Sequence, residues 1–260
     1  FALGLHDNYQ DMYESTESFP RGVCRWKDGS LQIGGAWAGG QAYILHGSAS
    51  LEYAKRNWEK INILGPGGMM VDTTTAMHLY QSFEKGKERS KADDFRAKSE
   101  LVQFYKDQGT LFGSEEVADF AIPGIDWYET RHHRIHGETI PLWPLVFHDA
   151  ALLMSYGSGL PGKISPGKSP LEWLEAMQWG YMLHYFYSAD FDFRRFGESA
   201  HVDRWHAKVA LDEMTKHSFL DEHQSVEQSE FSSGNAIICN YGPEPFSMEG
   251  REIGPESYLH

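Results

Sequence analysis

The stretch GGMMVDTTTA, residues 67–76, decides how the rest of the chain is interpreted. Its short apolar run follows two glycines, ends at Asp72 and is succeeded by three threonines. Apolar runs of about four to eight residues bounded by turn-forming residues are typical of a strand buried in a parallel sheet. The pattern therefore predicts a strand at residues 67–73 that carries Asp72 close to its carboxyl end.

The same arrangement, an apolar run that ends in ionisable side chains, recurs elsewhere. It is found in the segments FALGLH (1–6), TLFGSE (110–115) and PLWPLVFHDA (141–150). Each segment is predicted to be a strand, and the residues at or next to their carboxyl ends are His6 and Asp7, Glu115 and Glu116, and His148 and Asp149. Because the carboxyl ends of parallel strands meet at one edge of a sheet, these side chains are expected near a common site.

Three further segments have the apolar spacing of helices: 48–61, 91–109 and 169–186. The last is expected to be mostly helical, with a strand at its end as an open alternative. In the first, Ser48 or Ser50 is expected to be the N-cap, because a hydroxyl oxygen there accepts a hydrogen bond from the first turn. In the second, the apolar face is predicted to run along Phe95, Val102 and Tyr105. Strands that alternate with helices imply a parallel sheet.

The predicted fold class is α/β, and residues 1–218 are expected to form the C-terminal part of a (β/α)8 barrel of the TIM type. About five of the eight strands are visible, so the first strands are expected to precede Phe1. A doubly wound sheet would also bind ligands at its strand ends. However, GPGG at 65–68 precedes a strand and not a helix, so a nucleotide-binding loop is not expected.

The pattern changes after about residue 218. The segments SVEQSEF, SSGN and AIICNYG predict a strand, a tight turn and a second strand, and MEGREIGPES continues in the same glycine-rich manner. Residues 219–260 are therefore expected to begin an antiparallel β-sandwich domain.

Composition limits the partners of the chain. Its 260 residues carry a formal net charge of −14 at pH 7 without a basic patch, so neither nucleic acid nor a membrane surface is expected as a partner. No window approaches the ~20 apolar residues of a membrane span. A neutral sugar is compatible with this charge. Localisation stays open between secreted and bacterial cytoplasmic, and Cys24 and Cys239 permit a disulfide without requiring one.

Asp72 and Glu115 are the candidate catalytic pair. Cleavage of a glycosidic bond needs one carboxyl group that protonates the leaving oxygen and another that attacks or activates water. Asp72 is the candidate nucleophile, and the alternative is that it caps the next turn or helix. Glu115 is the candidate general acid and base, and the alternative is that it opens a helix together with Glu116. Adjacent strand residues face opposite sides, so one of the two glutamates should enter the site.

Several other residues are candidates for substrate binding. Asp126 and Trp127 lie together in IPGIDWYET, where an aromatic face and a carboxylate suit a sugar, although an ordinary surface loop is an equal alternative. Trp37 lies in GGAWAGG, and a large aromatic between glycines suits a loop that contacts substrate. The pairs His6 and Asp7, and His148 and Asp149, are candidates for binding hydroxyl groups, although a single histidine at a strand end is more often structural.

The segment RHHRIHGE, 131–138, raises the question of a metal. His132, His133 and His136 lack the helical HExxH arrangement, and no carboxylate lies at a familiar offset. No metal site is therefore predicted there, and a solvated loop is favoured. A metal-dependent hydrolase built on these histidines stays as an alternative class.

Taken in order, VDTTTA, GSEE, IPGIDWYE, PLWPLVFHDA and SSGNAIICNYG resemble the catalytic barrel of endo-α-N-acetylgalactosaminidases, glycoside hydrolase family 101, and of the related family 129. The resemblance extends from HDNY at 6–9 to NYG at 240–242 and implies that the chain is a fragment of a longer protein. Those families use an aspartate nucleophile and a glutamate acid/base with retention of configuration.

Carried over, the resemblance matches Asp72 to the nucleophile and Glu115 to the acid/base, while Asp126, His148 and Asp149 match substrate contacts. It implies a glycan as the substrate, with an α-N-acetylgalactosaminide as one candidate. No cofactor is predicted; some members bind calcium, for which no ligands can be placed in this sequence. The competing class is a sugar-binding barrel that has lost catalysis.

Overall fold

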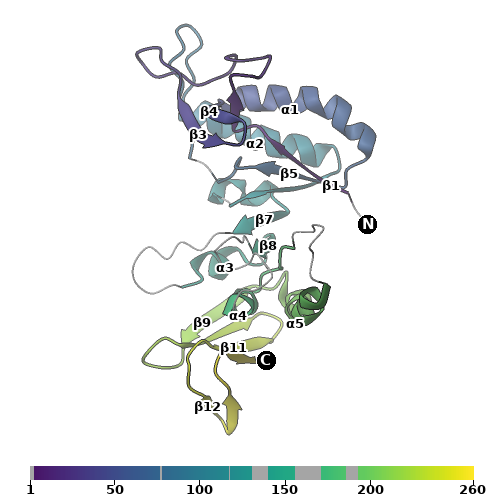
Figure 1. Cartoon of the computed structure of the whole chain (residues 1–260), viewed down its shortest axis with the longest axis vertical. Helices are drawn as coiled ribbons and strands as arrows, with labels where there is room; N and C mark the ends of the chain where they lie inside the picture. Colours follow the sequence, from purple (N-terminus) through teal and green to yellow (C-terminus); the bar gives the residue numbers. More distant parts are fainter. Residues whose placement is uncertain (1–2, 77, 117, 131–139, 156–170, 186–192) are drawn as a thin grey trace. The chain divides into compact units, whose positions relative to one another are not determined.

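The computed structural model describes residues 3–76, 78–116, 118–130, 140–155, 171–185 and 193–260. The chain divides into two compact units, Phe1–Trp127 and Tyr128–His260, and each is described by itself (Figure 1). Among the described residues, no helix is both long enough and apolar enough to cross a membrane. Cys24 and Cys239 are each a buried free thiol.

The first unit contains three parallel strands, β1 (Gly4–Asn8), β5 (Gly68–Asp72) and β6 (Leu111–Glu115), with β5 in the middle. The predicted parallel strands are confirmed, and β1 continues to Asn8, beyond its expected end at His6. The register pairs Asn8 with Asp72.

Because side chains alternate along a strand, the register assigns each residue to one of two faces. One face carries Met69, Val71 and Phe112, which are fully buried. Helix α2 (Lys91–Asp107) covers this face through Tyr105, whose ring is stacked on Phe112 at 6.0 Å, and α1 (Gly47–Ile61) packs on α2 through Trp58. The helices thus bury one face of the sheet and leave the other for polar residues at the strand ends.

The N-cap of α1 differs from the predicted one. The cap of α1 is His46, whose Nδ1 accepts from the Ser48 amide at 3.2 Å, so the prediction of Ser48 or Ser50 was wrong. The Ser50 hydroxyl is engaged elsewhere, because it donates to the Tyr9 carbonyl at 2.6 Å. Helix α2 begins with a capping box formed by Ser90 and Asp93.

The buried face of α2 differs from the predicted one at Phe95. This side chain is 39% exposed and packs edge-on against Phe120 at 5.3 Å, whereas Val102 and Tyr105 are buried as expected. The buried face also includes two charged residues, Asp94 and Lys98. Helical spacing alone did not reveal them, since charged groups are seldom buried without partners.

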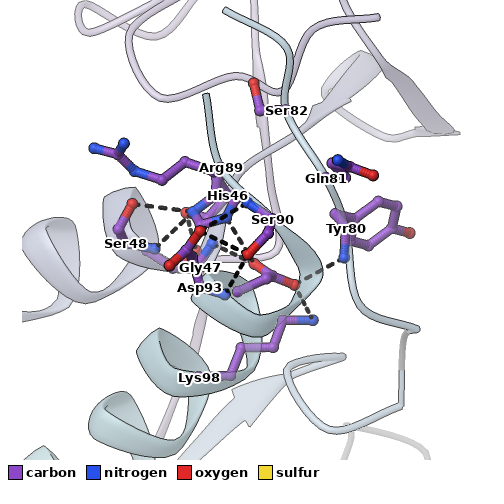
Figure 2. A network of polar contacts seen from close by, with 12 residues as sticks. His46, Gly47, Ser48, Tyr80, Gln81, Ser82, Arg89, Ser90, Asp93 and Lys98 are labelled. Carbon is purple, nitrogen blue, oxygen red and sulfur yellow. Dashed lines mark hydrogen bonds and ion pairs between the residues drawn. The ribbon is translucent and has the colours of Figure 1, made fainter. Parts of the chain in front are cut away.

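Asp94 organises a buried polar network that joins α1, α2 and the segment before α2; Figure 2 labels its partners Gly47, Tyr80 and Lys98. Its carboxylate accepts from the backbone amides of Gly47 at 2.6 Å and Tyr80 at 2.9 Å. Lys98 Nζ lies 3.7 Å from one carboxylate oxygen, and His46 Nε2 lies 3.9 Å from the other. Burial of a charge is unfavourable unless it is paired and hydrogen-bonded, so these partners are what allow Asp94 to be fully buried.

An antiparallel sheet is inserted between β1 and α1. Its strands β2 (Asp11–Tyr13), β3 (Ile33–Trp37) and β4 (Gly40–Ile44) have the order β2-β4-β3. Strands β3 and β4 form a hairpin, and β2 adds a third strand. Short 3-10 segments follow α1 and β6, at η1 (Asn62–Leu64) and η2 (Asp119–Gly124).

Strand β7 (Trp127–Thr130) straddles the boundary between the units, and β8 (Leu152–Ser155) is its neighbour in a sheet. The predicted strand at 141–150 is wrong, because the segment forms helix α3 (Leu142–Phe147). Two prolines account for this. Pro141 is the N-cap and Pro144 lies in the first turn, where a missing N–H is tolerated, whereas an inner strand needs that donor.

The rest of the second unit is helical and then antiparallel. Helices α4 (Leu171–Trp179) and α5 (Phe193–Val209) pack together, with the Trp205 indole donating to the Met177 carbonyl at 2.7 Å. A four-stranded antiparallel sheet of order β14-β11-β10-β9 follows, with a two-stranded sheet β12-β13. Their bounds are β9 (Met214–Phe219), β10 (Val226–Phe231), β11 (Ala236–Asn240), β12 (Phe246–Met248), β13 (Arg251–Ile253) and β14 (Ser257–Leu259). The predicted change to antiparallel structure is confirmed, and it begins at Met214.

Candidate active site

Asp72 and Glu115 are the last residues of two neighbouring parallel strands, β5 and β6. The register pairs Met70 with Gly113, so by alternation Asp72 and Glu115, two residues further along each strand, lie on the same face. Neighbouring strands lie roughly 4.8 Å apart, so two side chains at equivalent positions are close neighbours. The first unit therefore presents a carboxylate pair at the carboxyl edge of its sheet, on the face away from α2.

The alternatives based on helix starts do not fit the local structure. After Asp72 the chain turns at residues 73–76, and the next helix, α2, begins only at Lys91. After Glu115 the next helical element is η2, whose N-cap is Ala118. Neither Asp72 nor Glu115 is the cap of a helix, which leaves the turn as the remaining structural role for Asp72.

A buried hydroxyl pair ties the ends of the two strands together. The Ser114 hydroxyl donates to the Val71 carbonyl at 2.7 Å and accepts from the Thr75 amide at 3.3 Å. The Thr75 hydroxyl donates to the Glu116 carbonyl at 2.5 Å. Both hydroxyl-bearing residues are fully buried. The backbone positions of Asp72 and Glu115 are therefore fixed relative to each other by hydrogen bonds that extend beyond the strand ladder.

The residue after each carboxylate has a left-handed backbone. Thr73 has φ +53° and Glu116 has φ +43°. Such a conformation is uncommon for any residue other than glycine and is a clear outlier for a β-branched one. It costs of order 1–3 kcal/mol and persists only where the surroundings impose it, which happens most often at functional sites. Both strands thus end in a sharp turn directly after their acidic residue.

Asn8, which the sequence analysis did not select, lies beside Asp72. Its Nδ2 donates to Asp72 Oδ2 at 3.3 Å. The two candidates that were selected on β1 lie differently. Asp7 alternates to the helix-covered side, where it accepts from the Tyr9 hydroxyl and from the Asn8 amide. His6 is exposed and shares the face of Asp72 by register. The signal for Asn8 was strand alternation, once β1 is allowed to run to its true end.

Trp127 and Asp126 contact different residues of β6. A Cβ atom on Gly113 would lie 2.0 Å from Cε2 of Trp127, so the indole covers Gly113 on the face of Asp72 and Glu115. Asp126 lies near the start of the strand instead, where its carboxylate accepts from the Phe112 amide at 2.8 Å and pairs with Lys106 at 3.4 Å. These contacts favour a structural role for Asp126, and its predicted contact with substrate stays a prediction.

Trp37 ends strand β3 and is 63% exposed. Its indole lies over Gly35, because a Cβ atom on that glycine would be 2.4 Å from Cζ2 of Trp37. The ring therefore packs on backbone at one side, and most of the side chain is exposed to solvent. This is the geometry of an aromatic surface that can receive a sugar, and the predicted contact with substrate stays a prediction.

His148 is 1% exposed and follows α3, so it does not lie at the end of a strand as predicted. Its Nδ1 lies 2.7 Å from the Asp212 carbonyl and its Nε2 lies 3.4 Å from the Gly180 carbonyl. Burial lowers the pKa of this imidazole, with the neighbouring carbonyls opposing the shift. His148 therefore joins segments of the second unit as a neutral core residue, while Asp149 is exposed beside it.

The second unit also holds a carboxylate–imidazole pair that the sequence analysis passed over. Glu129, on β7, is 6% exposed, and its Oε1 lies 3.1 Å from Nδ1 of His184. Glu129 lies two residues after Trp127 and therefore alternates to the same face of its strand. That alternation was the signal that could have found it.

His132, His133 and His136 lie outside the described residues. Within the part of the chain that the structure describes, no group of three or more histidine, cysteine, aspartate or glutamate side chains is arranged to hold a metal ion.

Comparisons with known proteins connect this fold to glycoside hydrolases. No protein-family model and no curated protein matches the sequence. Among solved structures, the ligand-free α-N-acetylgalactosaminidase NagBb from Bifidobacterium bifidum matches with a TM-score of 0.76 and 23% identity over 92% of this chain. The same enzyme in complex with GalNAc gives a TM-score of 0.74. A β-L-arabinopyranosidase from Geobacillus stearothermophilus gives a TM-score of 0.54 with 10% identity.

The match to ligand-free NagBb covers 92% of this chain but only 40% of the NagBb chain. The match to the arabinopyranosidase covers 72% of that enzyme's chain. At these identities the likeness shows the fold. The resemblance to the family 101 and 129 glycosidases that the sequence motifs suggested is confirmed at that level.

Proposed function

We propose that this chain carries the catalytic carboxylates of a retaining glycosidase, with Asp72 as nucleophile and Glu115 as general acid and base. The observation that supports the proposal best is that Asp72 and Glu115 are the last residues of the neighbouring parallel strands β5 and β6 and share one face by alternation. Carboxyl groups of a retaining enzyme lie about 5–5.5 Å apart, and neighbouring strands supply a spacing of that order.

The proposed reaction has two steps. In the first, a carboxylate oxygen of Asp72 forms a bond to the anomeric carbon while the bond to the leaving oxygen breaks, and the Glu115 carboxylic acid gives its proton to that oxygen. In the second, the Glu115 carboxylate takes a proton from water, the water oxygen bonds to the anomeric carbon, and the bond to Asp72 breaks. Two inversions give net retention.

Trp127 has the proposed role of a platform for the sugar. Its indole covers Gly113, two residues before Glu115, on the face that carries both carboxylates. An aromatic face there can contact the C–H groups of a pyranose ring. Glu116, His6 and Trp37 remain proposed substrate contacts, each on the placement given above.

For the surrounding architecture, we propose that β1, β5 and β6 are successive strands of a (β/α)8 barrel, of which residues 1–218 form the C-terminal part. The strand-helix alternation and the active-site position at the strand ends support it. The antiparallel sheets of residues 219–260 are proposed to belong to a β-sandwich.

For the substrate, we propose a glycan with a terminal or internal α-linked N-acetylgalactosamine. The support is the likeness in fold to an α-N-acetylgalactosaminidase, one structure of which is a complex with GalNAc. A neutral sugar also suits a chain with a net charge of −14.

The test is hydrolysis of a panel of aryl α- and β-glycosides by the protein in its full natural length. We expect turnover of the α-N-acetylgalactosaminide. NMR of the early product should detect the α-anomer as the form that is released first. Asp72→Asn should lower kcat/KM by at least ~10³-fold, and Glu115→Gln should slow substrates with poor leaving groups more than nitrophenyl substrates. The matched controls are Asp107→Asn and Glu100→Gln, which alter exposed carboxylates of α2.

Three results would count against parts of the proposal. Turnover that Asp72→Asn leaves intact would show a glycosidase with a different nucleophile. Release of the β-anomer from an α-glycoside would show inversion. Absence of turnover on every glycoside, with sugar binding still measurable by calorimetry, would favour the sugar-binding barrel over the enzyme.

A further inference from the structure

We propose that Asn8 is a positioning residue for Asp72, and that its side-chain amide holds the nucleophile in the ionised, correctly turned state. The inference rests on the proposed function and deepens it. The starting observation is the contact between Asn8 Nδ2 and Asp72 Oδ2 at 3.3 Å, made between residues that are paired in register at the ends of β1 and β5.

The orientation of the Asn8 amide is determined by a second contact. Its Oδ1 accepts from the Gln10 backbone amide at 2.7 Å. A backbone N–H is only a donor, so the oxygen of the side chain must face it. The NH₂ group is thereby directed to Asp72, and the reversed assignment of nitrogen and oxygen would lose the bond to Gln10 and place two acceptors together.

Gln10 is in turn held by the buried network around Asp94. Its side chain is 4% exposed, and its Oε1 accepts from Lys98 Nζ at 3.2 Å. Its carbonyl accepts from the Leu45 amide at 2.9 Å. Lys98, which is labelled in Figure 2, is 3% exposed and is paired with Asp94. A fixed turn at Gln10 therefore fixes the amide that contacts the nucleophile.

The chemistry of the contact suits a nucleophilic carboxylate. An amide N–H donates to the ionised carboxylate better than to the protonated acid, so it favours the form that can attack. A single directed bond also restricts rotation of the carboxyl group about its last torsion, which keeps an oxygen aimed at the anomeric carbon. The other ionisable groups on this face of the neighbouring strands are His6 on β1 and Glu115 on β6.

The decisive variant is Asn8→Asp, which is close to isosteric. A carboxylate at position 8 can still accept from the Gln10 amide, so the turn is retained, but it has no N–H for Asp72 and brings a like charge beside it. We expect kcat/KM on the aryl α-glycoside to fall about 10- to 100-fold, mainly through kcat. The acid limb of the pH profile should move up by about one pH unit, because a nearby like charge favours protonation of the nucleophile.

Two further variants separate positioning from structure. Asn8→Ser keeps an oxygen near the Gln10 amide and should have an intermediate rate, with the acid limb close to that of the parent. Asn57→Ala is the matched control: this asparagine donates to the Tyr9 hydroxyl at 3.3 Å on the helix-covered side, and its removal should change kcat/KM by less than about 2-fold. Melting temperatures of all variants are measured in parallel.

The results that would overturn the inference differ from those that would overturn the function. Turnover that is abolished by Asp72→Asn but is within about 2-fold of the parent in Asn8→Asp would refute the role of Asn8 alone. An Asn8→Asp loss without any shift of the acid limb, equal to the loss in Asn57→Ala, would show a structural effect. Absence of turnover in the parent protein would refute the proposed function and this inference with it.

Discussion

At the scale of single residues, the candidate site depends on small side chains that hold larger ones. Ser114 and Thr75 tie together the ends of two strands, and Gly113 leaves room for an indole. None of these three residues carries out chemistry in the proposed mechanism. Each nevertheless contacts or makes room for part of the proposed site, which makes the three residues informative positions for substitution.

Ser114→Ala should destabilise the first unit and lower activity together. The change leaves the Thr75 amide without its acceptor in a fully buried position, which costs about 1–3 kcal/mol in the free energy of unfolding. Urea unfolding followed by tryptophan fluorescence measures this loss. Ser99→Ala is the control, because Ser99 donates to the Phe95 carbonyl on the α2 surface and should change stability by less than ~0.5 kcal/mol. Equal effects of the two changes would refute the strand-end role of Ser114.

Gly113→Ala should displace the Trp127 indole. The new Cβ atom would lie 2.0 Å from the indole, a distance that no adjustment of bond angles accommodates, so the expected loss is about 1–3 kcal/mol with a change in tryptophan emission. Gly4→Ala, at the start of β1, is the matched control, since its Cβ meets nothing within 4 Å. Unchanged emission and unchanged kcat/KM in Gly113→Ala would argue against Trp127 as the sugar platform.

At the scale of elements, buried polar groups connect segments that are distant in sequence. Asp94 links the start of α1, the Tyr80 segment and α2 through two backbone amides and a lysine. Asp94→Ala should therefore cost about 3–5 kcal/mol, since it leaves Lys98 as an uncompensated buried charge. Asp93→Ala removes only the exposed half of the capping box and should cost about 1 kcal/mol. Similar losses on thermal unfolding would contradict the assignment of Asp94 as the organising residue.

The terminal antiparallel sheet should give a pH-dependent stability through His217. Its side chain on β9 is 3% exposed, and burial lowers the pKa to about 4 from the usual 6.5. Between pH ~4 and ~6.5, this histidine is therefore protonated in the unfolded chain and neutral in the folded chain. Stability from this group is fully present above pH ~6.5 and is lost as the pH falls toward 4. The Glu227 carboxylate, with Oε2 3.5 Å from Nε2, favours the protonated ring and offsets part of this loss.

The slope of unfolding free energy against pH, measured between pH 7 and 4 for the parent and for His217→Gln, tests this. The variant should show a shallower slope, whereas His223→Gln, at an exposed position, should leave the slope unchanged. Identical slopes in all three proteins would mean that other groups carry the acid sensitivity.

Element formation also shows what local sequence determines. The strands β5 and β6 and the helices α1 and α2 follow from apolar spacing, because their partners bury the side that the spacing predicts. The prediction of a strand at 141–150 was wrong because it gave more weight to the apolar composition than to two prolines. An inner strand needs the backbone N–H donors that prolines lack.

Contacts between distant segments explain the remaining differences. Asn8 gains its significance from pairing with a residue 64 positions away, and His148 becomes a core residue through carbonyls of residues 180 and 212. No local pattern encodes such pairings. The position of Asp72 and Glu115 at the ends of neighbouring strands was predictable, since each acidic residue directly follows an apolar run. Their catalytic roles stay a prediction.

At the scale of the whole molecule, the net charge of −14 predicts how rates depend on salt. Neutral aryl glycosides should show kcat/KM values that change little between about 20 and 300 mM NaCl, a range that includes physiological ionic strength. Sulfated glycosides should be turned over more slowly, and their kcat/KM should rise with salt as repulsion is screened. A faster rate for the anionic substrate at low salt would reveal a local positive region that outweighs the overall charge.

The two left-handed residues that follow Asp72 and Glu115 also matter to anyone who would transplant this carboxylate pair into another scaffold. Suppose that only the two acidic side chains are copied onto neighbouring strands. The strands would then continue straight on, and the residues that follow would extend over the carboxylates. The grafted unit would have to include each sharp reversal and the hydroxyl pair that enforces it. The smallest portable form of this site is therefore a pair of strand ends with their turns.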